Sequence, residues 1–307
     1  MRSLAAALAL LAALLLPAAM PAGSAGAAIV VSSKIDTEGA LLGNMILELL
    51  AARGLPVDNR LALGPTAILR AAILSKAIDL YPEYTGNGAF FFHRENDPAW
   101  RDWRRGYALV KKLDWEKNRL VWLTPAPADN SWVIAVRRDV ARRHHLKTME
   151  DFARYINGGG YIKLAASAEF VESPAALPAF EKTYGFHLSD RQLVTLAGGN
   201  TAATERAAAE GMAGVNAAMA YGTDGALAAL GLLALADDKG AEIVYAPAPV
   251  VRAAVLARYP AIAPALARLF ATLTLGRLQR LNAEIAVAGK SAAAVAAAYL
   301  RAGHFLR

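Results

Sequence analysis

An internal repeat constrains the fold of this chain more than any other feature of its sequence. Gly64-Pro65-Thr66-Ala67 opens one apolar helical stretch, and Gly199-Asn200-Thr201-Ala202 opens a second, alanine-rich one. Each stretch leads to a polar residue, Asp79 in the first copy and Asn216 in the second, with a tyrosine five residues further on. We therefore expect the same helix-strand-loop unit to occur twice, once in each of two lobes.

Strand-like and helix-like patterns alternate along the whole chain. β-branched or apolar runs typical of strands, and apolar periodicity typical of helices, occur in turn. The strand-like segments are 29–33, 78–80 and 132–136, and the helical ones are 41–50, 67–75 and 149–156. This alternation predicts an α/β fold with largely parallel sheets.

The two copies of the repeat also predict a crevice between two lobes, because open α/β sheets bind ligands at the loops that follow their strands. Proline-rich stretches at 124–127 and 245–249 are the expected crossings between the lobes, and two crossings form a hinge. We expect lobe 1 to comprise residues 28–128 and 247–307, and lobe 2 to comprise residues 129–246. The segment 247–307 has mostly helical patterns and is expected to pack on lobe 1.

The N-terminus has the pattern of a secretory signal. Arg2 precedes an apolar run from Leu4 to Leu16, and a small-residue segment ends at Ala27, which predicts a cleavable signal peptide over residues 1–27. No later segment has about 18 consecutive apolar residues. The chain has no cysteine, so neither a disulfide nor a thiol-linked lipid is available. We expect a soluble, monomeric protein in the periplasm.

The composition offers little for catalysis or nucleic-acid binding. The formal net charge of +7 is scattered along the chain, whereas nucleic-acid binding favours clustered basic residues. There is no cysteine nucleophile, no H-E-x-x-H and no G-x-S-x-G, and the five histidines do not indicate a metal site. An enzyme would have to use carboxylates alone, such as Glu83, Glu169 or Asp224. We therefore expect a non-enzymatic protein without cofactor or metal.

Four aromatic residues occur at loop or crossing positions and not inside apolar runs. They are Tyr84, Trp132, Tyr221 and Tyr245. For each one taken alone, packing or a hinge contact is the alternative interpretation. Together they favour a cage for a quaternary ammonium group, because such a cation has no N–H donors and is attracted to aromatic faces by about 0.5–2 kcal/mol each.

The segment Asp79-Leu80-Tyr81-Pro82-Glu83-Tyr84-Thr85-Gly86 resembles a motif of the glycine betaine, choline and proline-betaine binding proteins of ABC importers, within them the OsmF/YehZ type. The resemblance extends through segments 125–130, 164–170, 220–225 and 245–252. It implies a two-lobed periplasmic binding protein fold of type II, which closes on its ligand and presents it to the permease and ATPase subunits of an importer.

The same resemblance implies the site residues. The aromatic cage would consist of Tyr84, Trp132, Tyr221 and Tyr245. The carboxylate or polar end of the ligand would be bound by Lys34, Asn87, Asn130 and Ser173.

The main departure from the family pattern is at Ser173, where many relatives carry an arginine that can bind a carboxylate through two hydrogen bonds. The absence of this arginine predicts that the chain binds glycine betaine more weakly, by about 1.5–3 kcal/mol. Choline, carnitine, ectoine or another small zwitterion remain alternative ligands. A ligand-sensing periplasmic adaptor remains an alternative role.

Overall fold

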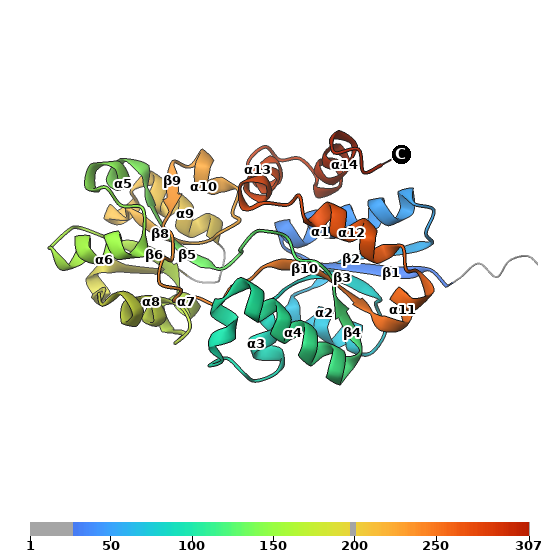
Figure 1. The fold of residues 1–307 in the computed structure, drawn as a ribbon. Coiled ribbons are helices and arrows are strands. Elements are labelled where there is room, and N and C mark those ends of the chain that lie inside the picture. Colours follow the sequence, from blue (N-terminus) through green and yellow to red (C-terminus); the bar gives the residue numbers. More distant parts are fainter. Residues whose placement is uncertain (1–26, 197–200, 307) are drawn as a thin grey trace, which may run out of the picture.

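The computed structural model describes residues 27–196 and 201–306, which form two lobes side by side (Figure 1). Each lobe is built on a five-stranded mixed sheet. In lobe 1 the strand order is β2 (Val57–Gly64), β1 (Ile29–Lys34), β3 (Leu80–Tyr84), β10 (Pro247–Arg252) and β4 (Leu120–Trp122). In lobe 2 the order is β7 (Leu193–Leu196), β6 (Leu164–Ser167), β8 (Ala217–Tyr221), β5 (Trp132–Arg137) and β9 (Leu232–Ala234).

Helices cover both sheets. Those of lobe 1 are α1 (Thr37–Ala52), α2 (Thr66–Leu74), α3 (Asn87–Phe91), α4 (Trp103–Asn118), α11 (Ala253–Arg258), α12 (Ile262–Phe270), α13 (Leu275–Ala286) and α14 (Ala292–Ala302). Those of lobe 2 are α5 (Arg138–His144), α6 (Met149–Asn157), α7 (Ala168–Glu172), α8 (Leu177–Tyr184), α9 (Thr201–Glu210) and α10 (Ala226–Ala229). Short 3₁₀ turns occur at Pro98–Arg101, Asp190–Gln192 and Met212–Gly214.

The two sheets have equivalent orders, and the repeated sequence units occupy equivalent places in them. Helix α2 leads to β3, the third strand of one sheet, and α9 leads to β8, the third strand of the other. Tyr84 and Tyr221 are the last residues of these two strands. The predicted two-lobed α/β fold is confirmed. The residues of Gly199-Asn200 in the second copy lie outside the described residues.

The sheets are less parallel than the sequence suggested, because β10 and β5 run antiparallel to both of their neighbours. Residues 247–249, expected to be part of a crossing, are the first residues of β10 and pair with β3. The prolines fit because Pro82 faces Pro249. The amide of Thr85 donates to the carbonyl of Ala246 at 3.0 Å, and the alternation of pairs in an antiparallel ladder then makes Pro82 and Pro249 a non-hydrogen-bonded pair, which needs no N–H from either residue.

The chain crosses between the lobes from β4 to β5 and again from β9 to β10. The two crossings are hydrogen-bonded to each other. The amide N of Asn130 donates to the carbonyl of Tyr245 at 3.0 Å, and Ser131 Oγ donates to the carbonyl of Ile243 at 2.6 Å. The exact lobe boundaries, 28–128 with 247–307 and 129–246, stay a prediction.

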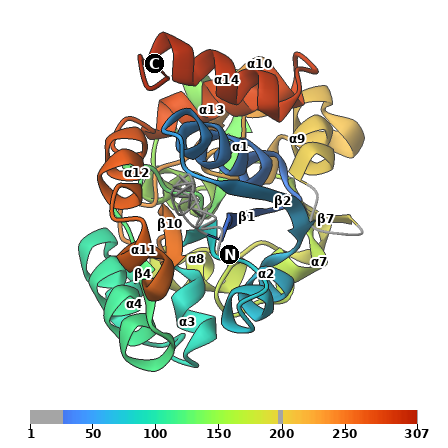
Figure 2. The same cartoon turned by 90° about the vertical axis from the view of Figure 1, so that its right-hand side faces the viewer.

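Helix α1 is at the centre of the lobe 1 core. It begins at Asp36, whose side chain accepts a hydrogen bond from the amide of Gly39 and caps the helix. Its fully buried apolar face contacts α12, α13 and α14, which lie along one side of it in Figure 2. Helix α13 also contacts α10 of lobe 2 and lies between the two lobes in Figure 1. Within the described ranges, no helix is both long and apolar enough to span a membrane.

Candidate ligand-binding site

A cavity of about 790 Å³ lies between the lobes, within the range of about 300–1,000 Å³ typical of small-molecule sites. It is lined by residues of both sheets, of both crossings and of α13. All eight residues predicted from the sequence are part of its lining: Lys34, Tyr84, Asn87, Asn130, Trp132, Ser173, Tyr221 and Tyr245. The structure thus brings these residues together, while their contacts with a ligand stay a prediction.

Lobe 2 contributes two of the aromatic side chains. Trp132 begins β5 and pairs with Tyr221, which ends the antiparallel strand β8. This register stacks the two rings, with centroids 6.3 Å apart and planes 20° from parallel. Phe170 packs on Trp132 in a T-shaped contact, with ring centroids 5.7 Å apart. Trp132 and Tyr221 therefore form a fixed aromatic pair at the edge of lobe 2.

Lobe 1 contributes Tyr84, whose position is determined by two contacts. Its hydroxyl donates to Glu38 Oε1 at 2.9 Å. The ammonium of Lys34 lies over its ring, 4.5 Å from the centroid. Because Tyr84 is only 5% exposed, the orientation of its ring is set by the fold and not by a ligand.

Tyr245 belongs to the second crossing and packs on the loop that follows Tyr84. A Cβ atom at Gly86 would lie 2.9 Å from the Tyr245 ring and 2.7 Å from Ile243, so the ring can approach only because residue 86 is glycine. The amide of Tyr245 donates to Asp129 Oδ1 in the first crossing at 2.9 Å. Tyr245 is thereby held by both crossings.

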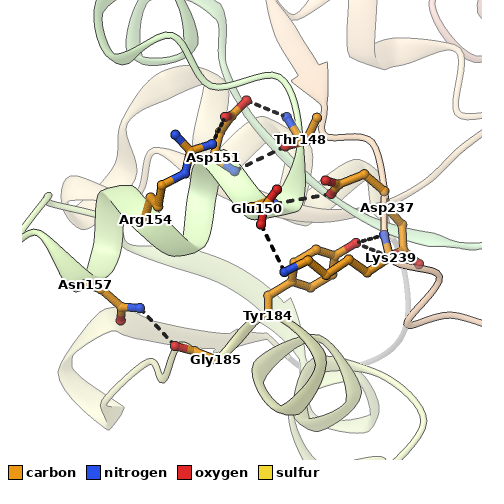
Figure 3. Close-up of polar contacts among 10 residues, drawn as sticks. Thr148, Glu150, Asp151, Arg154, Asn157, Tyr184, Gly185, Asp237 and Lys239 are labelled. Carbon is orange, nitrogen blue, oxygen red and sulfur yellow. Dashed lines mark hydrogen bonds and ion pairs between the residues drawn. The ribbon is translucent and has the colours of Figure 1, made fainter.

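A polar cluster on lobe 2 anchors the start of this second crossing (Figure 3). The carboxylate of Asp237 accepts hydrogen bonds from the Tyr184 hydroxyl and from the amides of Ala241 and Glu242. The Tyr184 hydroxyl in turn accepts from the amide of Lys239 at 2.7 Å. These contacts fix the chain directly before the residues that line the cavity.

The two donors predicted in lobe 1 are already used by a buried carboxylate, which the sequence did not indicate. Lys34 Nζ and Asn87 Nδ2 each donate to Glu83 Oε1 at 2.7 Å. Glu83 is fully buried and also accepts from the hydroxyl of Tyr81 and the amide of Tyr84. Lys34 and Asn87 keep further N–H groups, but the lysine charge is balanced within the protein.

The other two predicted polar residues are held differently. Asn130 accepts a hydrogen bond from the Thr223 hydroxyl at 2.6 Å through Oδ1, and its Nδ2 has no partner within the described part of the chain. Ser173 follows the last residue of α7, and its backbone amide closes that helix on the carbonyl of Glu169. The Asn130 side-chain amide group is therefore free to donate to a ligand. Ser173 has only a short, uncharged hydroxyl group to donate.

Acidic side chains are the main feature of the lining that sequence reasoning missed. Six of them line the cavity: Asp36, Glu38, Glu169, Glu205, Asp224 and Glu242. Lys34 is the one basic side chain among the described lining residues. Asp224 follows the second repeated tyrosine, and Glu38 follows the helix cap, but neither signal distinguishes a cavity residue from a surface one.

Burial keeps Glu205 protonated and Glu38 about half protonated near pH 7, because a buried site disfavours the charged form. Burial raises the pKa of Glu38 to about 7. Burial, together with the adjacent carboxylate of Asp224, raises the pKa of Glu205 to about 9. Burial also raises the pKa of Glu242 well above its usual range. One oxygen each of Glu205 and Glu242 is buried without a partner within the described residues.

Within residues 27–196 and 201–306, no three His, Asp or Glu side chains are grouped so that they could hold a metal ion. A cavity between two lobes joined by two crossings, lined by an aromatic pair from one lobe and by further tyrosines, is the arrangement of a solute-binding protein.

Comparison with known proteins identifies the family. Residues 27–302 match the substrate-binding domain of ABC-type glycine betaine transport systems, and the chain belongs to this family. It therefore belongs to a family of substrate-binding proteins and not of enzymes. The chain is 59% identical over 271 residues to the glycine betaine-binding protein YehZ of Escherichia coli, covering 88% of this chain and 89% of that protein.

Two further comparisons agree. A glycine-betaine-binding protein of Pseudomonas aeruginosa is 29% identical over 284 residues, covering 90% of this chain and 88% of that one. The solved structure of apo YehZ from E. coli has a TM-score of 0.83 at 57% identity, covering 91% of this chain and 99% of that chain.

Proposed function

We propose that the chain binds glycine betaine or a related quaternary ammonium solute in the cavity between its lobes, as the solute-binding subunit of an ABC importer. The observation that carries this proposal is that Tyr84, Trp132, Tyr221 and Tyr245 all line one cavity, in a chain 59% identical to a glycine betaine-binding protein. The signal-like N-terminus supports placement in the periplasm. Permease and ATPase subunits would be its partners.

The trimethylammonium group would be bound by aromatic faces from three parts of the fold. Tyr84 comes from lobe 1, Trp132 and Tyr221 from lobe 2, and Tyr245 from the second crossing. Because the faces are divided between lobes, a bound cation stabilises the arrangement that brings them together, and it shifts the population toward the closed form. Acidic lining residues add an attractive potential for the cation.

Weak binding of glycine betaine is part of the proposal. The ligand carboxylate would contact Ser173, at the position where an arginine could form two charge-assisted hydrogen bonds with it. Lys34, the one basic residue in the described lining, is already paired with Glu83 at 2.7 Å. The remaining donors in this region are neutral ones such as Asn130 Nδ2, whose hydrogen bonds contribute less, about 0.5–1.5 kcal/mol each.

Choline is a second candidate, and the charge of the lining favours it. Six carboxyl side chains and one lysine surround the cavity: Asp36, Glu38, Glu169, Glu205, Asp224, Glu242 and Lys34. Even with Glu205 protonated and Glu38 about half protonated, the carboxyls outnumber the single lysine, so the lining attracts a ligand with a net positive charge more than a zwitterion. A hydroxyl group can also donate to an acidic oxygen that lacks a partner, such as Glu205 Oε1.

Titration of the protein with glycine betaine and with choline tests these proposals, with heat and tryptophan fluorescence measured in parallel. Trp132 is the one tryptophan in the described lining. The variant Trp132→Phe keeps an aromatic face, so it should still bind by heat but lose the fluorescence change. Trp115→Phe, at an exposed site away from the cavity, should keep both signals. Absence of saturable heat with either ligand at millimolar concentration would contradict the proposed function.

A further inference from the structure

Glu38 is a buried acid of the cavity lining whose contacts extend beyond the proposed aromatic cage. It is the second residue of α1 and only 5% exposed. Both of its carboxyl oxygens are occupied. Oε1 accepts from the Tyr84 hydroxyl at 2.9 Å, and Oε2 accepts from Asn282 Nδ2 of α13 at 2.8 Å. The side chain therefore orients a lining tyrosine and contacts the helix that lies between the lobes.

The contact with Asn282 continues into lobe 2. The same Nδ2 group donates to the carbonyl of Thr223 at 3.0 Å, in the loop after β8. One turn earlier on α13, Gln279 Nε2 donates to the carbonyl of Gly222 at 2.8 Å. Glu38 thus belongs to a chain of hydrogen bonds from Tyr84 in lobe 1, through α13, to the loop that begins at Tyr221 in lobe 2.

The charges around Glu38 are mostly negative. Asp36, at the cap of its own helix, and Asp224, in the facing loop of lobe 2, are acidic and line the same cavity. Tyr84 from β3 faces it with a neutral hydroxyl, and α13 presents the neutral amide of Asn282. Lys34 from β1 lies beyond the Tyr84 ring and is paired with Glu83. Within the described residues, no cation is paired with Glu38.

We propose that Glu38 is a positioning residue whose ionised form supports ligand binding, so that the protein releases a proton when it takes up a ligand with a quaternary ammonium group. This inference rests on the proposed function. An ionised carboxylate accepts the Tyr84 and Asn282 hydrogen bonds as charge-assisted bonds, whereas a protonated one must donate to the Tyr84 hydroxyl, so that both bonds become weaker neutral ones. Ionisation therefore favours the arrangement that joins Tyr84 to the loop of lobe 2.

The ligand brings a positive charge into a cavity where Glu38 has no cationic partner among the described residues. A quaternary ammonium group in the cavity favours the charged form of Glu38, so it lowers the pKa of this carboxyl from its value of about 7 in the free protein. Binding and proton release are reciprocal. The affinity therefore rises with pH from about 6 to 8, by up to about tenfold for each unit by which the ligand lowers the pKa.

Calorimetric titration with glycine betaine at pH 7, in two buffers with different heats of ionisation, measures the released protons without any mutation. We expect roughly 0.5 proton per ligand, because a group at its pKa is half protonated. Affinities at pH 6, 7 and 8 should rise accordingly. The described lining has no histidine, but Glu205 and Glu242, whose pKa values are also raised by burial, lie in it, and a Glu38 variant separates their contribution from that of Glu38.

The variant Glu38→Gln keeps the shape and an acceptor for Tyr84 but cannot ionise. Its affinity should rise less between pH 6 and 8 than that of the parent, because only the contribution of Glu205 and Glu242 remains. Glu48→Gln, on the same helix outside the cavity lining, is the matched control and should keep the parental profile.

Two results would overturn the inference while leaving the proposed function intact. The first is saturable binding whose heat is the same in both buffers and whose affinity does not change from pH 6 to 8. The second is a Glu38→Gln variant that retains the parental pH profile. Absence of saturable binding at every pH would instead contradict the proposed function, and this inference with it.

Discussion

At the scale of single residues, the aromatic side chains of the cavity differ in how they are held. Tyr84 is fixed through its hydroxyl by Glu38, whereas Tyr221 is fixed by stacking on Trp132 and by its backbone amide, which donates to Asp224 at 2.8 Å. The rings of Trp132 and Tyr221 are therefore oriented by the strand register and by their stacking on each other. A change at Tyr221 tests the aromatic face more directly than one at Tyr84.

Replacement of Tyr221 by leucine should weaken binding of glycine betaine and of choline to similar degrees. Leucine keeps an apolar side chain beside Trp132 but removes one aromatic face, which corresponds to about 0.5–2 kcal/mol, or roughly 2- to 30-fold in Kd. Calorimetry measures the change. Tyr161→Leu, at an exposed tyrosine of the same lobe, is the control and should bind like the parent. Unchanged affinity of Tyr221→Leu would exclude Tyr221 from the cage.

Replacement of Ser173 by arginine should discriminate between the two ligands. A guanidinium group can bind the carboxylate of glycine betaine through two charge-assisted bonds, so Kd should fall by roughly one to two decades, about 1.5–3 kcal/mol. Choline has no carboxylate and should bind no better. Ser173→Met, similar in length but uncharged, is the control. Equal gains for both ligands would show that residue 173 does not face the carboxylate.

The sequence predicted the aromatic residues of the site better than its acids. Tyr84 and Tyr221 end strands of a repeated unit, so their common position follows from local pattern. Glu38 and Glu205 are each inside a helix, where an acid usually faces solvent. Their burial depends on how two separate lobes and α13 meet, and this information is not contained in local periodicity.

At the scale of secondary-structure elements, α13 is the third contact between the lobes besides the two crossings. Its backbone lies against the loop after β8 so closely that a Cβ at Gly225 would be 2.1 Å from the amide N of Ala283. Gly225 itself has a φ of −75°, which other residues also adopt. The glycine is therefore required for close approach and not for backbone conformation.

Replacement of Gly225 by alanine should lower the free energy of unfolding by about 1–3 kcal/mol, because the new methyl group meets backbone that has no room to move. Gly276→Ala, on α13 itself, is the matched control. Its Cβ would have only the end of the Arg280 side chain nearby, at 4.0 Å, so stability should stay equal or rise by up to about 1 kcal/mol. Urea unfolding compares the two. Equal stabilities would show that α13 does not pack on this loop.

Element boundaries were predictable where periodicity was strong and failed where proline obscured it. The helical pattern over 41–50 became α1, and the run 132–136 became β5. The segment Pro247–Arg252 contains two prolines, which argue against a strand. It nevertheless forms β10, because Pro82 and Pro249 face each other at a pair where the ladder requires no N–H. This register depends on the positions of prolines in two strands, so it cannot be predicted from either strand alone.

At the scale of the whole molecule, the buried acids make stability depend on pH in an unusual direction. Burial raises the pKa of Glu38 to about 7 and that of Glu205 to about 9, above the value of 4.5 for an unhindered glutamate. Above about pH 4.5 the unfolded chain therefore binds fewer protons at these groups than the folded one. These groups stabilise the fold at low pH, and this contribution is lost as the pH rises.

The ligand-free protein should accordingly lose stability between about pH 5 and pH 8. Thermal unfolding at half-unit intervals measures this, and Tm should fall as the pH increases. Glu205→Gln should flatten the decline above pH 7, while Glu210→Gln, on the same helix outside the cavity lining, should leave it unchanged. A Tm that rises steadily from pH 5 to 8 would show that these carboxyls are solvated.

The place of β10 in the lobe 1 sheet has a consequence for how the chain folds as it is made. Strand β10 separates β3 from β4, so the ladder β2-β1-β3-β10-β4 cannot be completed until residue 252 is present. The strands of lobe 2 lie in one continuous stretch, 132–234, and are all available earlier. Domains fold as units when their chain is complete. Lobe 2, in the middle of the polypeptide, should therefore fold first. The N-terminal part of lobe 1 can complete its sheet only after β10, in the last sixty or so residues, has been added.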